Sequence, residues 1–450
     1  MSLTRSPRPS APRLRVFPSE RGARADSAVA PFSQGYVWLA LGAVLFAILG
    51  FGGVYSYIWA PVDCVLFAAT ALLFWQAAAR RQWLWHAWLA PMLGFWGLVA
   101  GQWIFHISVY PAVTFTGLIQ LTGCGCVFLL LIAGLHTEVI WNRAAWLLWL
   151  FCGLLAAEAL VQYFGGNGYI YGFHNATYAW PVGPFVYHNH FAGCMDLLMP
   201  IALCVAFRAE AAFEPLWQRW LRRGMVPALG LASVLISRSR GGLFTLSFEL
   251  LLAMGLFWPE LRKQKLARAA LGSSIVIMGI FSFAARWGPM LRRLGHLSGH
   301  DPSWTQRWRV MVACWHIFGA HPLYGTGFNT FASVYPAFQL FDNGRVFLFA
   351  HNDYAQLLAE MGSLGALCAA GFLWLWTRAF WQCLRRRGRR LRTGQLSAFI
   401  AMAGFLLHAA GDFQFHNPAN ALLFFAIGAM AVAPRIDRPS ISHSIPKESK

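Results

Sequence analysis

Charged residues are scarce in this chain of 450 residues: only 12% are Asp, Glu, Lys or Arg, whereas 58% are hydrophobic. The mean hydropathy is +0.49. A soluble domain of this size could not stay in solution with so apolar a composition. The composition therefore excludes a soluble protein and indicates one that crosses a membrane several times.

Motifs for nucleotides and metals are also missing. The sequence has no Walker loop and no Rossmann glycine pattern, so nothing in it indicates ATP or NAD chemistry. The nine cysteines are scattered, with only Cys124 and Cys126 close together, and there is no CxxC pair or zinc-ligand spacing. A site built from the outer histidines is the one metal alternative that stays open. We expect no metal and no cofactor.

Long apolar runs are what the sequence has in abundance. A helix needs about 20 residues to cross roughly 30 Å of hydrocarbon. By this measure we expect an all-α, polytopic protein with about 12 transmembrane helices in a domain over residues 35–434, between a disordered basic tail (1–34) and a C-terminal tail (435–450), both cytoplasmic. The predicted spans are 35–53, 60–79, 83–101, 113–135, 144–164, 188–207, 224–240, 241–258, 266–286, 351–377, 394–414 and 418–434.

The basic residues report the orientation of these spans. A net charge of +19 would suggest nucleic acid if the cations clustered on a soluble face, but they lie in short loops between apolar runs. With the N-terminus inside, most loops rich in Lys and Arg fall on the cytoplasmic side, and no nucleic-acid partner is expected. The eight cations left outside, of the 36 in the chain, are Arg238, Arg240, Arg286, Arg292, Arg293, Arg307, Arg309 and Arg345.

The longest outer segment is the predicted loop 287–350, which contains an aromatic stripe. At 100° per residue, Trp308, Met311, Trp315 and Phe318 fall within about 40° of Trp304. Arg307 lies at the edge of this stripe. The pattern predicts an interfacial helix with its tryptophans at the depth of the lipid headgroups.

Two outer arginines lie between two short spans. The runs 224–240 and 241–258 correspond to roughly 25 to 27 Å of helix each, which puts Arg238 and Arg240 at the outer membrane edge. An arginine at that depth is costly unless it faces water or an anion, although both could also extend to lipid headgroups. Gly241 and Gly242 would allow the next helix to present its amides to a phosphate.

His351 begins the run HNDYAQLLAEMGSLG. If the helix starts here, Gly362 and Gly365 lie about +20° and −40° from His351 and allow a neighbouring helix to approach. The positive end of the helix dipole disfavours imidazolium, so His351 would be neutral near pH 7 and able to act as a general base. The alternative is a histidine that only caps or packs.

Further polar candidates lie on the same side, in the segments 187–193, 321–327 and 412–422. Asp412 is an acid inside a predicted span, and its alternative role is a structural pair with an outer arginine or a helix terminus. The full set of candidate substrate-binding residues is Arg238, Arg309, Asn352, His190, His321 and Asp412.

Three of these stretches resemble motifs of the bacterial O-antigen ligase and polymerase family. HNDYAQLLAEMGSLG fits its pattern of a histidine followed by spaced glycines, and SRSRGG is similar to its Ser-x-Ser-Arg-Gly motif. QRWRVMVACWHIFGAHPLYGTGFNTF is similar to its outer-loop segment, with Met311 where many members have Trp. The resemblance covers most of the chain.

This resemblance implies a glycosyltransferase of the bacterial inner membrane. Such enzymes take a glycan from an undecaprenyl diphosphate carrier on the periplasmic side and use neither metal nor nucleotide. In this chain Arg240 and Arg307 match the arginines that bind the diphosphate, and His351 matches the residue that activates the acceptor hydroxyl. The expected partners are the lipid-linked donor, lipid A core or another glycan as acceptor, and membrane lipids.

Two alternatives stay open at the level of sequence. A ligase would transfer a finished glycan to lipid A core, whereas a polymerase would transfer it to another lipid-linked repeat or build an exopolysaccharide. No appended soluble domain suggests a protein acceptor, so the ligase is favoured. A transporter of a lipid-linked or anionic substrate is the alternative of another class, although neither an inverted repeat nor paired broken helices are evident.

Overall fold

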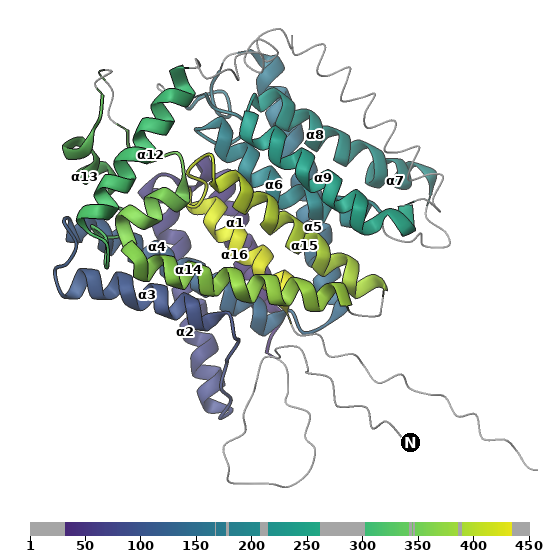
Figure 1. The fold of residues 1–450 in the computed structure, drawn as a ribbon. Helices are drawn as coiled ribbons and strands as arrows, with labels where there is room; N and C mark the ends of the chain where they lie inside the picture. The colour runs from purple at the N-terminus through teal and green to yellow at the C-terminus, as the bar shows by residue number, and fades with distance from the viewer. Residues whose placement is uncertain are drawn as a thin grey trace, which may run out of the picture.

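The computed structural model describes residues 32–166, 168–176, 180–207, 215–261, 302–341, 344, 347–385 and 389–433. In this part of the chain all regular elements are helices, apart from two isolated β-bridges. They form one helical bundle (Figure 1). The expectation of an all-α protein is confirmed for these residues.

The helices follow the apolar runs closely. In chain order they are α1 (Gly35–Leu49), η1 (Phe51–Gly53), α2 (Ser56–Ala79), α3 (Leu89–Ile104), α4 (Pro111–Gly134), α5 (Glu138–Gly165), α6 (His188–Ala206), α7 (Leu216–Trp220), η2 (Leu221–Met225), α8 (Val226–Ser237), α9 (Arg240–Leu261), α12 (Pro302–Ala320), α13 (Phe331–Phe338), α14 (Asp353–Arg385), α15 (Arg389–Ala409) and α16 (Pro418–Val432).

Six of these helices are long and apolar enough to cross a membrane: α2, α4, α5, α6, α9 and α14. The shorter apolar helical segments are α1, α3, α16 and the part Thr393–Ala409 of α15. The predicted span 266–286 lies outside the described residues. The count of about 12 transmembrane helices therefore stays a prediction.

Local sequence explains several helix ends. Thr137 accepts a hydrogen bond from the Ile140 amide at the start of α5 (3.3 Å), and this helix ends at Gly166 in the left-handed conformation (φ 81°). At the start of α16, Asn417 accepts from the Asn420 amide (3.0 Å), and Pro418 takes the first helical position. These are preferred residues for helix N-caps, first turns and C-caps.

The predicted span 224–240 differs from the observed helix. Helical structure runs without a break from α7 through a π-turn (η2) into α8, which ends at Ser237. Arg222 in the π-turn is buried because its guanidinium donates to the carbonyls of Val205 (3.0 Å) and Ala206 (2.9 Å). These carbonyls lie at the C-terminal end of α6, where helical carbonyls take partners from outside the helix. The arginine therefore fastens α8 to α6.

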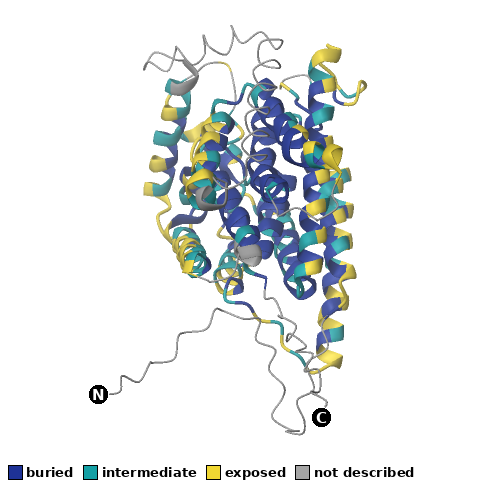
Figure 2. Cartoon of the chain, turned by 90° about the vertical axis from the view of Figure 1, so that its right-hand side faces the viewer, coloured by how far each residue is buried: buried dark blue, intermediate teal, exposed yellow. Residues whose placement is uncertain are grey.

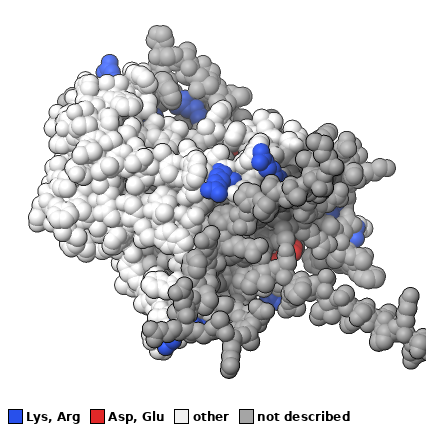
Figure 3. Space-filling model, turned by 60° about the horizontal axis from the view of Figure 1, so that its bottom comes forward, with Lys and Arg blue, Asp and Glu red and all other residues white. Residues whose placement is uncertain are grey.

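The centre of the bundle is α6, in which every residue from Asn189 to Ala206 is buried. It packs against α5, α8, α9, α15 and α16. Figure 2 shows buried segments at the centre and exposed faces on the outer helices. In Figure 3 the few visible charged side chains are separated by broad uncharged surface. Both features are expected of a helical bundle that contacts lipid.

Two tryptophans of the α12 stripe lie on the exposed face, as expected of an interfacial helix, whereas Met311 packs against the buried side. Trp308 and Trp315 are 58% and 57% exposed. The opposite face, which includes Val310 and Ile317, is buried against α13 and α14. In Figure 1, α12 and α13 lie together at one side of the bundle, beside the start of α14.

The glycines of α14 do not have the role that we expected. Gly362 has non-helical dihedral angles (φ 60°, ψ −159°), so α14 is kinked and the predicted common face with His351 is wrong. The close approach at Gly362 is by a loop, because a methyl group there would lie 2.5 Å from the Leu323 carbonyl oxygen. The kink accommodates the turn 321–327, which bonds to α14 through the Thr326 amide and the Ala359 carbonyl (3.0 Å).

Candidate active site

The loop 410–417 between α15 and α16 is the centre of the candidate site. The prediction that Asp412 lies inside a span is wrong, because α15 ends at Ala409 and Asp412 follows in this loop. Asp412 is 1% exposed. Its carboxylate meets side chains from three other parts of the chain, and these contacts define the site.

Four groups surround the Asp412 carboxylate. Oδ1 accepts from the Phe413 amide (2.9 Å) and lies 3.1 Å from Nδ1 of His351. Oδ2 accepts from the Asn189 side-chain amide and lies 3.9 Å from the Arg307 guanidinium. α6, α12 and the segment before α14 therefore converge on one buried carboxylate.

His351 lies just before α14 rather than within it. Asn352 is the N-cap, since its side-chain oxygen accepts from the Ala355 amide (2.9 Å). The Asn352 side-chain amide also donates to the Ala410 carbonyl (2.8 Å), which joins the cap to the loop. His351 has a positive φ of 53°, a rare conformation for this residue type that marks functional or strained positions. Its side chain is 19% exposed.

The charges at this point favour an ionised Asp412. Burial by itself raises the pKa of Asp412, but the hydrogen bond with His351 and the positive charge of Arg307 outweigh it and hold the pKa well below its usual value. An ionised carboxylate accepts hydrogen bonds only, so Nδ1 of His351 carries the proton that points to Asp412. In the neutral ring, Nε2 is then the basic nitrogen.

Arg307 contacts the same loop and stays partly open to its surroundings. One guanidinium nitrogen donates to the Gly411 carbonyl (2.8 Å), and the side chain is 28% exposed. A guanidinium has five N–H donors. The loop uses only some of them, so Arg307 can also bind an anion.

A second polar network holds the loop on α14. His416 bonds to Asp353 (2.7 Å) and, through Nε2, to Gln356 (2.9 Å), which donates in turn to Glu360 (2.9 Å). Burial alone lowers the pKa of His416, whereas the hydrogen bonds to Asp353 and Glu360 raise it. The Gln356 side-chain amide donates to Nε2, so the proton of the ring lies on Nδ1, toward Asp353.

This network was not among the features predicted from the sequence. A usable signal was present in the spacing of Asp353, Gln356 and Glu360, which lie three and four residues apart and share one helix face. Glu360 also accepts from the amides of Asn329 (2.8 Å) and Phe331 (3.0 Å) and so fixes the start of α13.

Three further candidate substrate-binding residues have surroundings other than the Asp412 carboxylate. The Arg238 guanidinium stacks over Trp180 (4.4 Å to the ring centroid). Arg309 lies over the Phe341 ring (5.6 Å). His321 is exposed at the end of α12. Their role in binding a substrate stays a prediction.

His190 lies within the cluster. It is buried on α6 with its ring edge-on to Phe413 at a centroid distance of 4.7 Å. The same Phe413 ring contacts His351 (4.9 Å). Of the six candidate substrate-binding residues, Asp412, Asn352 and His190 are therefore the three that the fold brings to His351.

Arg240 is the first residue of α9 and is partly buried. The two glycines after it act in helix packing. A methyl group at Gly241 would lie 2.6 Å from Nε2 of His408 on α15. The Gly242 amide donates to the side chain of Ser239 (3.1 Å), so the expectation that this amide is free for a phosphate is wrong.

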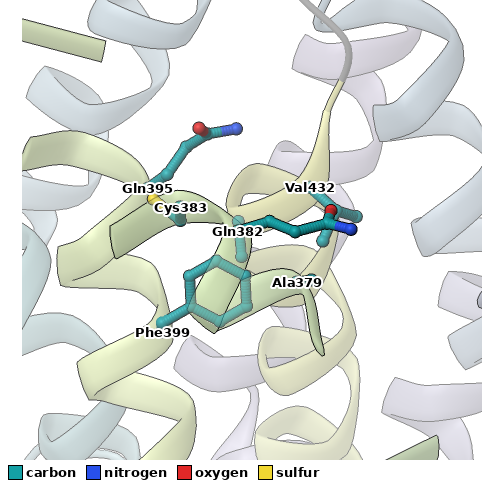
Figure 4. A pocket seen from close by; sticks show the side chains of 7 residues that line it. Ala379, Gln382, Cys383, Gln395, Phe399 and Val432 are labelled. Atoms are coloured by element: carbon teal, nitrogen blue, oxygen red, sulfur yellow. The ribbon is translucent and has the colours of Figure 1, made fainter. Parts of the chain in front are cut away.

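A metal centre or a separate pocket would be an alternative to the site at Asp412. No group of three or more His, Cys, Asp or Glu side chains in the described ranges could hold a metal ion. A small pocket is lined by Ala379, Cys383 and Phe399, among others (Figure 4). Ala379 lies 26 residues after the first residue of α14, or roughly 40 Å of helix. This pocket is not part of the candidate site.

Residues 226–370 match the family model described as O-antigen ligase, and this match supports the O-antigen ligase and polymerase family. Together with the apolar helices, it indicates an integral membrane protein. The matched segment contains Arg240, Arg307 and His351, whereas Asp412 lies beyond its end. A search of curated proteins finds no match to the chain.

Proposed function

We propose that this protein transfers a glycan from an undecaprenyl diphosphate carrier to an acceptor hydroxyl on the periplasmic side of the inner membrane. O-antigen ligation to lipid A core is the favoured reaction. The family indicates an activity of the O-antigen ligase or polymerase type. The observation that carries the proposal is the convergence of His351 and Arg307 on the buried Asp412.

His351 is the general base in this proposal. The acceptor oxygen attacks the anomeric carbon and gives its proton to Nε2 of His351, while the bond from that carbon to the diphosphate oxygen breaks. Asp412 accepts the hydrogen bond from Nδ1 of His351 (Nδ1 to Oδ1, 3.1 Å), so it orients the ring and stabilises the imidazolium that forms. The partial exposure of His351 leaves a path for the acceptor.

Arg307 and Arg240 bind the phosphates of the donor. The lipid diphosphate gains negative charge as it leaves, and fixed cations stabilise this charge most in a partly dehydrated site. Guanidinium suits the role because it stays charged and offers forked donors to phosphate oxygens. This chemistry uses only side chains of the protein.

The experiment that tests the reaction is a deletion strain analysed by lipopolysaccharide gel electrophoresis. If the protein is a ligase, the strain makes bare core and accumulates the lipid-linked polymer. Core that carries a single repeat would show a polymerase instead. An unchanged ladder would contradict both and direct the search to another polymer, such as an exopolysaccharide.

A further inference from the structure

Three ionisable side chains meet inside the bundle, in helices that we assign to the membrane. Asp196 of α6, Glu249 of α9 and His408 of α15 are 0%, 1% and 3% exposed. Oδ2 of Asp196 lies 2.6 Å from Nδ1 of His408. Ionisable groups at such positions are costly and commonly mark proton or ion sites.

Two glycines make room for this cluster between α9 and α15. The His408 ring lies against Gly241, and the Glu249 side chain lies against Gly404, where a methyl group would overlap the carboxylate. The contact of Gly241 with His408 and the contact of Glu249 with Gly404 run in opposite directions along the two sequences. The helices α9 and α15 are therefore antiparallel. Side chains lean toward the N-terminus of their own helix, and those of Glu249 and His408 therefore lean toward each other.

Several polar atoms of the cluster have no hydrogen-bond partner among the described residues. They are both carboxylate oxygens of Glu249, Oδ1 of Asp196 and Nε2 of His408. Buried polar atoms without a partner are rare in folded proteins and call for an explanation. The three side chains are not arranged to hold a metal ion.

The charge of the cluster indicates what it binds. An electrostatic interaction joins Glu249 to Asp196 on α6, and Asp196 bonds in turn to His408 on α15, while α8 carries no ionisable group between Val226 and Ser237. On α9 itself the nearest cation is Arg240, nine residues or about 13 Å of helix away. With Asp196 and Glu249 ionised and His408 protonated, one net negative charge would be buried, at a cost of several kcal/mol.

We propose that Asp196, Glu249 and His408 form a proton-binding site inside the membrane, with the exchangeable proton on Glu249. Asp196 and His408 then form a neutral ion pair, and the cluster as a whole carries no net charge. Loss of the proton leaves a negative charge on Glu249 as well as on Asp196. The repulsion between these two charges forces α9 away from α6 and α15.

The cluster is connected to the candidate active site at two points. His408 lies against Gly241, the residue after Arg240. The backbone carbonyl of His408 also accepts from the amide of Gly411 (2.9 Å), which lies in the loop that carries Asp412. The proton therefore fixes the first turn of α9 and makes Glu249 a positioning residue for Arg240, a consequence that rests on the proposed function.

The site can be tested without any glycan donor. The full-length protein is reconstituted in vesicles of phosphatidylethanolamine and phosphatidylglycerol, and the infrared band of protonated carboxyl groups is recorded against pH. We expect Glu249→Gln to remove one protonated carboxyl at neutral pH. Glu138→Gln, in the partly exposed first turn of α5, is the matched control and should leave the band unchanged. An unchanged band in Glu249→Gln overturns the proposal.

Glu249→Gln should fold, because glutamine has the shape and charge of protonated glutamic acid. If it does not fold, Gly404→Ala asks the same question, since its methyl group displaces the carboxyl and must shift the frequency of the band. An unshifted band in Gly404→Ala also overturns the proposal.

The positioning role needs a second measurement. The KM for the lipid-linked donor should rise in the wild type at alkaline pH and stay constant in Glu249→Gln. If the KM for the donor rises equally at alkaline pH in the wild type and in Glu249→Gln, Glu249 has no role in positioning Arg240. Absence of any transfer in the wild type would overturn the proposed function, while the infrared result would still report on the proton site.

Discussion

Replacing Asp412 with asparagine isolates the part that its charge plays in catalysis. The wild-type carboxylate lies 3.1 Å from Nδ1 of His351 and accepts hydrogen bonds from Asn189 and the Phe413 amide. Asparagine keeps the shape but removes the charge. Its NH₂ group must face either the Phe413 amide or the Asn189 amide, both of which are donors.

The size of the effect follows from the geometry. Two unit charges about 4 Å apart attract by about 4 kcal/mol at an effective dielectric constant of about 20. Asp412 contributes this attraction when His351 becomes imidazolium in the transition state. Its loss corresponds to about a 10³-fold fall in kcat. We expect KM for the donor to change much less, because the charge on His351 develops only during the reaction.

The assay is transfer from a purified lipid-linked donor to its acceptor in vesicles, measured across pH. Asp353→Asn is the matched control, because Asp353 is also a buried aspartate paired with a histidine but does not touch His351. This control should lose stability and keep kcat. If Asp412→Asn keeps kcat within about twofold of the wild type, Asp412 has only a structural role and the reasoning is refuted.

The same carboxylate sets an acid limit to stability. Its pKa is lower in the folded protein than in the unfolded chain, so its contribution is present above the ordinary aspartate value of about 4. As the pH falls below that value, the unfolded chain takes up a proton that the folded protein does not, so the contribution is lost progressively until the folded-state pKa is reached. Thermal unfolding in detergent should show this loss in the wild type and a weaker dependence in Asp412→Asn.

The other predictions concern the base, the cations and the orientation. His351→Ala should reduce transfer by about 10²- to 10⁴-fold while protein level and donor binding stay near normal; full activity would leave His351 with a structural role only. Arg240→Lys and Arg307→Lys should each lose most of the transfer rate, and the double variant should lose less than the product because both act on one leaving group. Full activity in either lysine variant would mean that only positive potential is needed there. A periplasm-active reporter fused near Leu297 should be active and one fused near Gly388 silent; the reverse would place His351 in the cytoplasm.

Sequence alone determined the features that depend on local pattern. The length of an apolar run and the period of its side chains decide whether a segment forms a membrane helix and which face is exposed. For this reason the α12 stripe, with Trp308 and Trp315 exposed, could be predicted from spacing. The motifs around Arg240, Arg307 and His351 are also local, and with them the sequence indicated the family.

Contacts between distant segments were decided by the tertiary structure. Asp412 lies 61 residues from His351 in the chain, and no local pattern reports that they touch. The helix wheel that grouped His351 with Gly362 assumed an unbroken helix, but the turn at 321–327 lies so close that α14 bends at Gly362. Arg238 and Arg240 are two residues apart, but Arg238 is the C-cap of α8 and Arg240 is the first residue of α9. Arg238 therefore points in its own direction and stacks on Trp180.

The intramembrane cluster shows the same division. In the sequence, Asp196, Glu249 and His408 are ionisable residues in three separate apolar runs. Each helix can form without the others, because backbone hydrogen bonding and helix length are properties of one segment. Which residues face one another depends on how the helices cross, and this is set by the shapes of all the side chains between them, including the notches at Gly241 and Gly404.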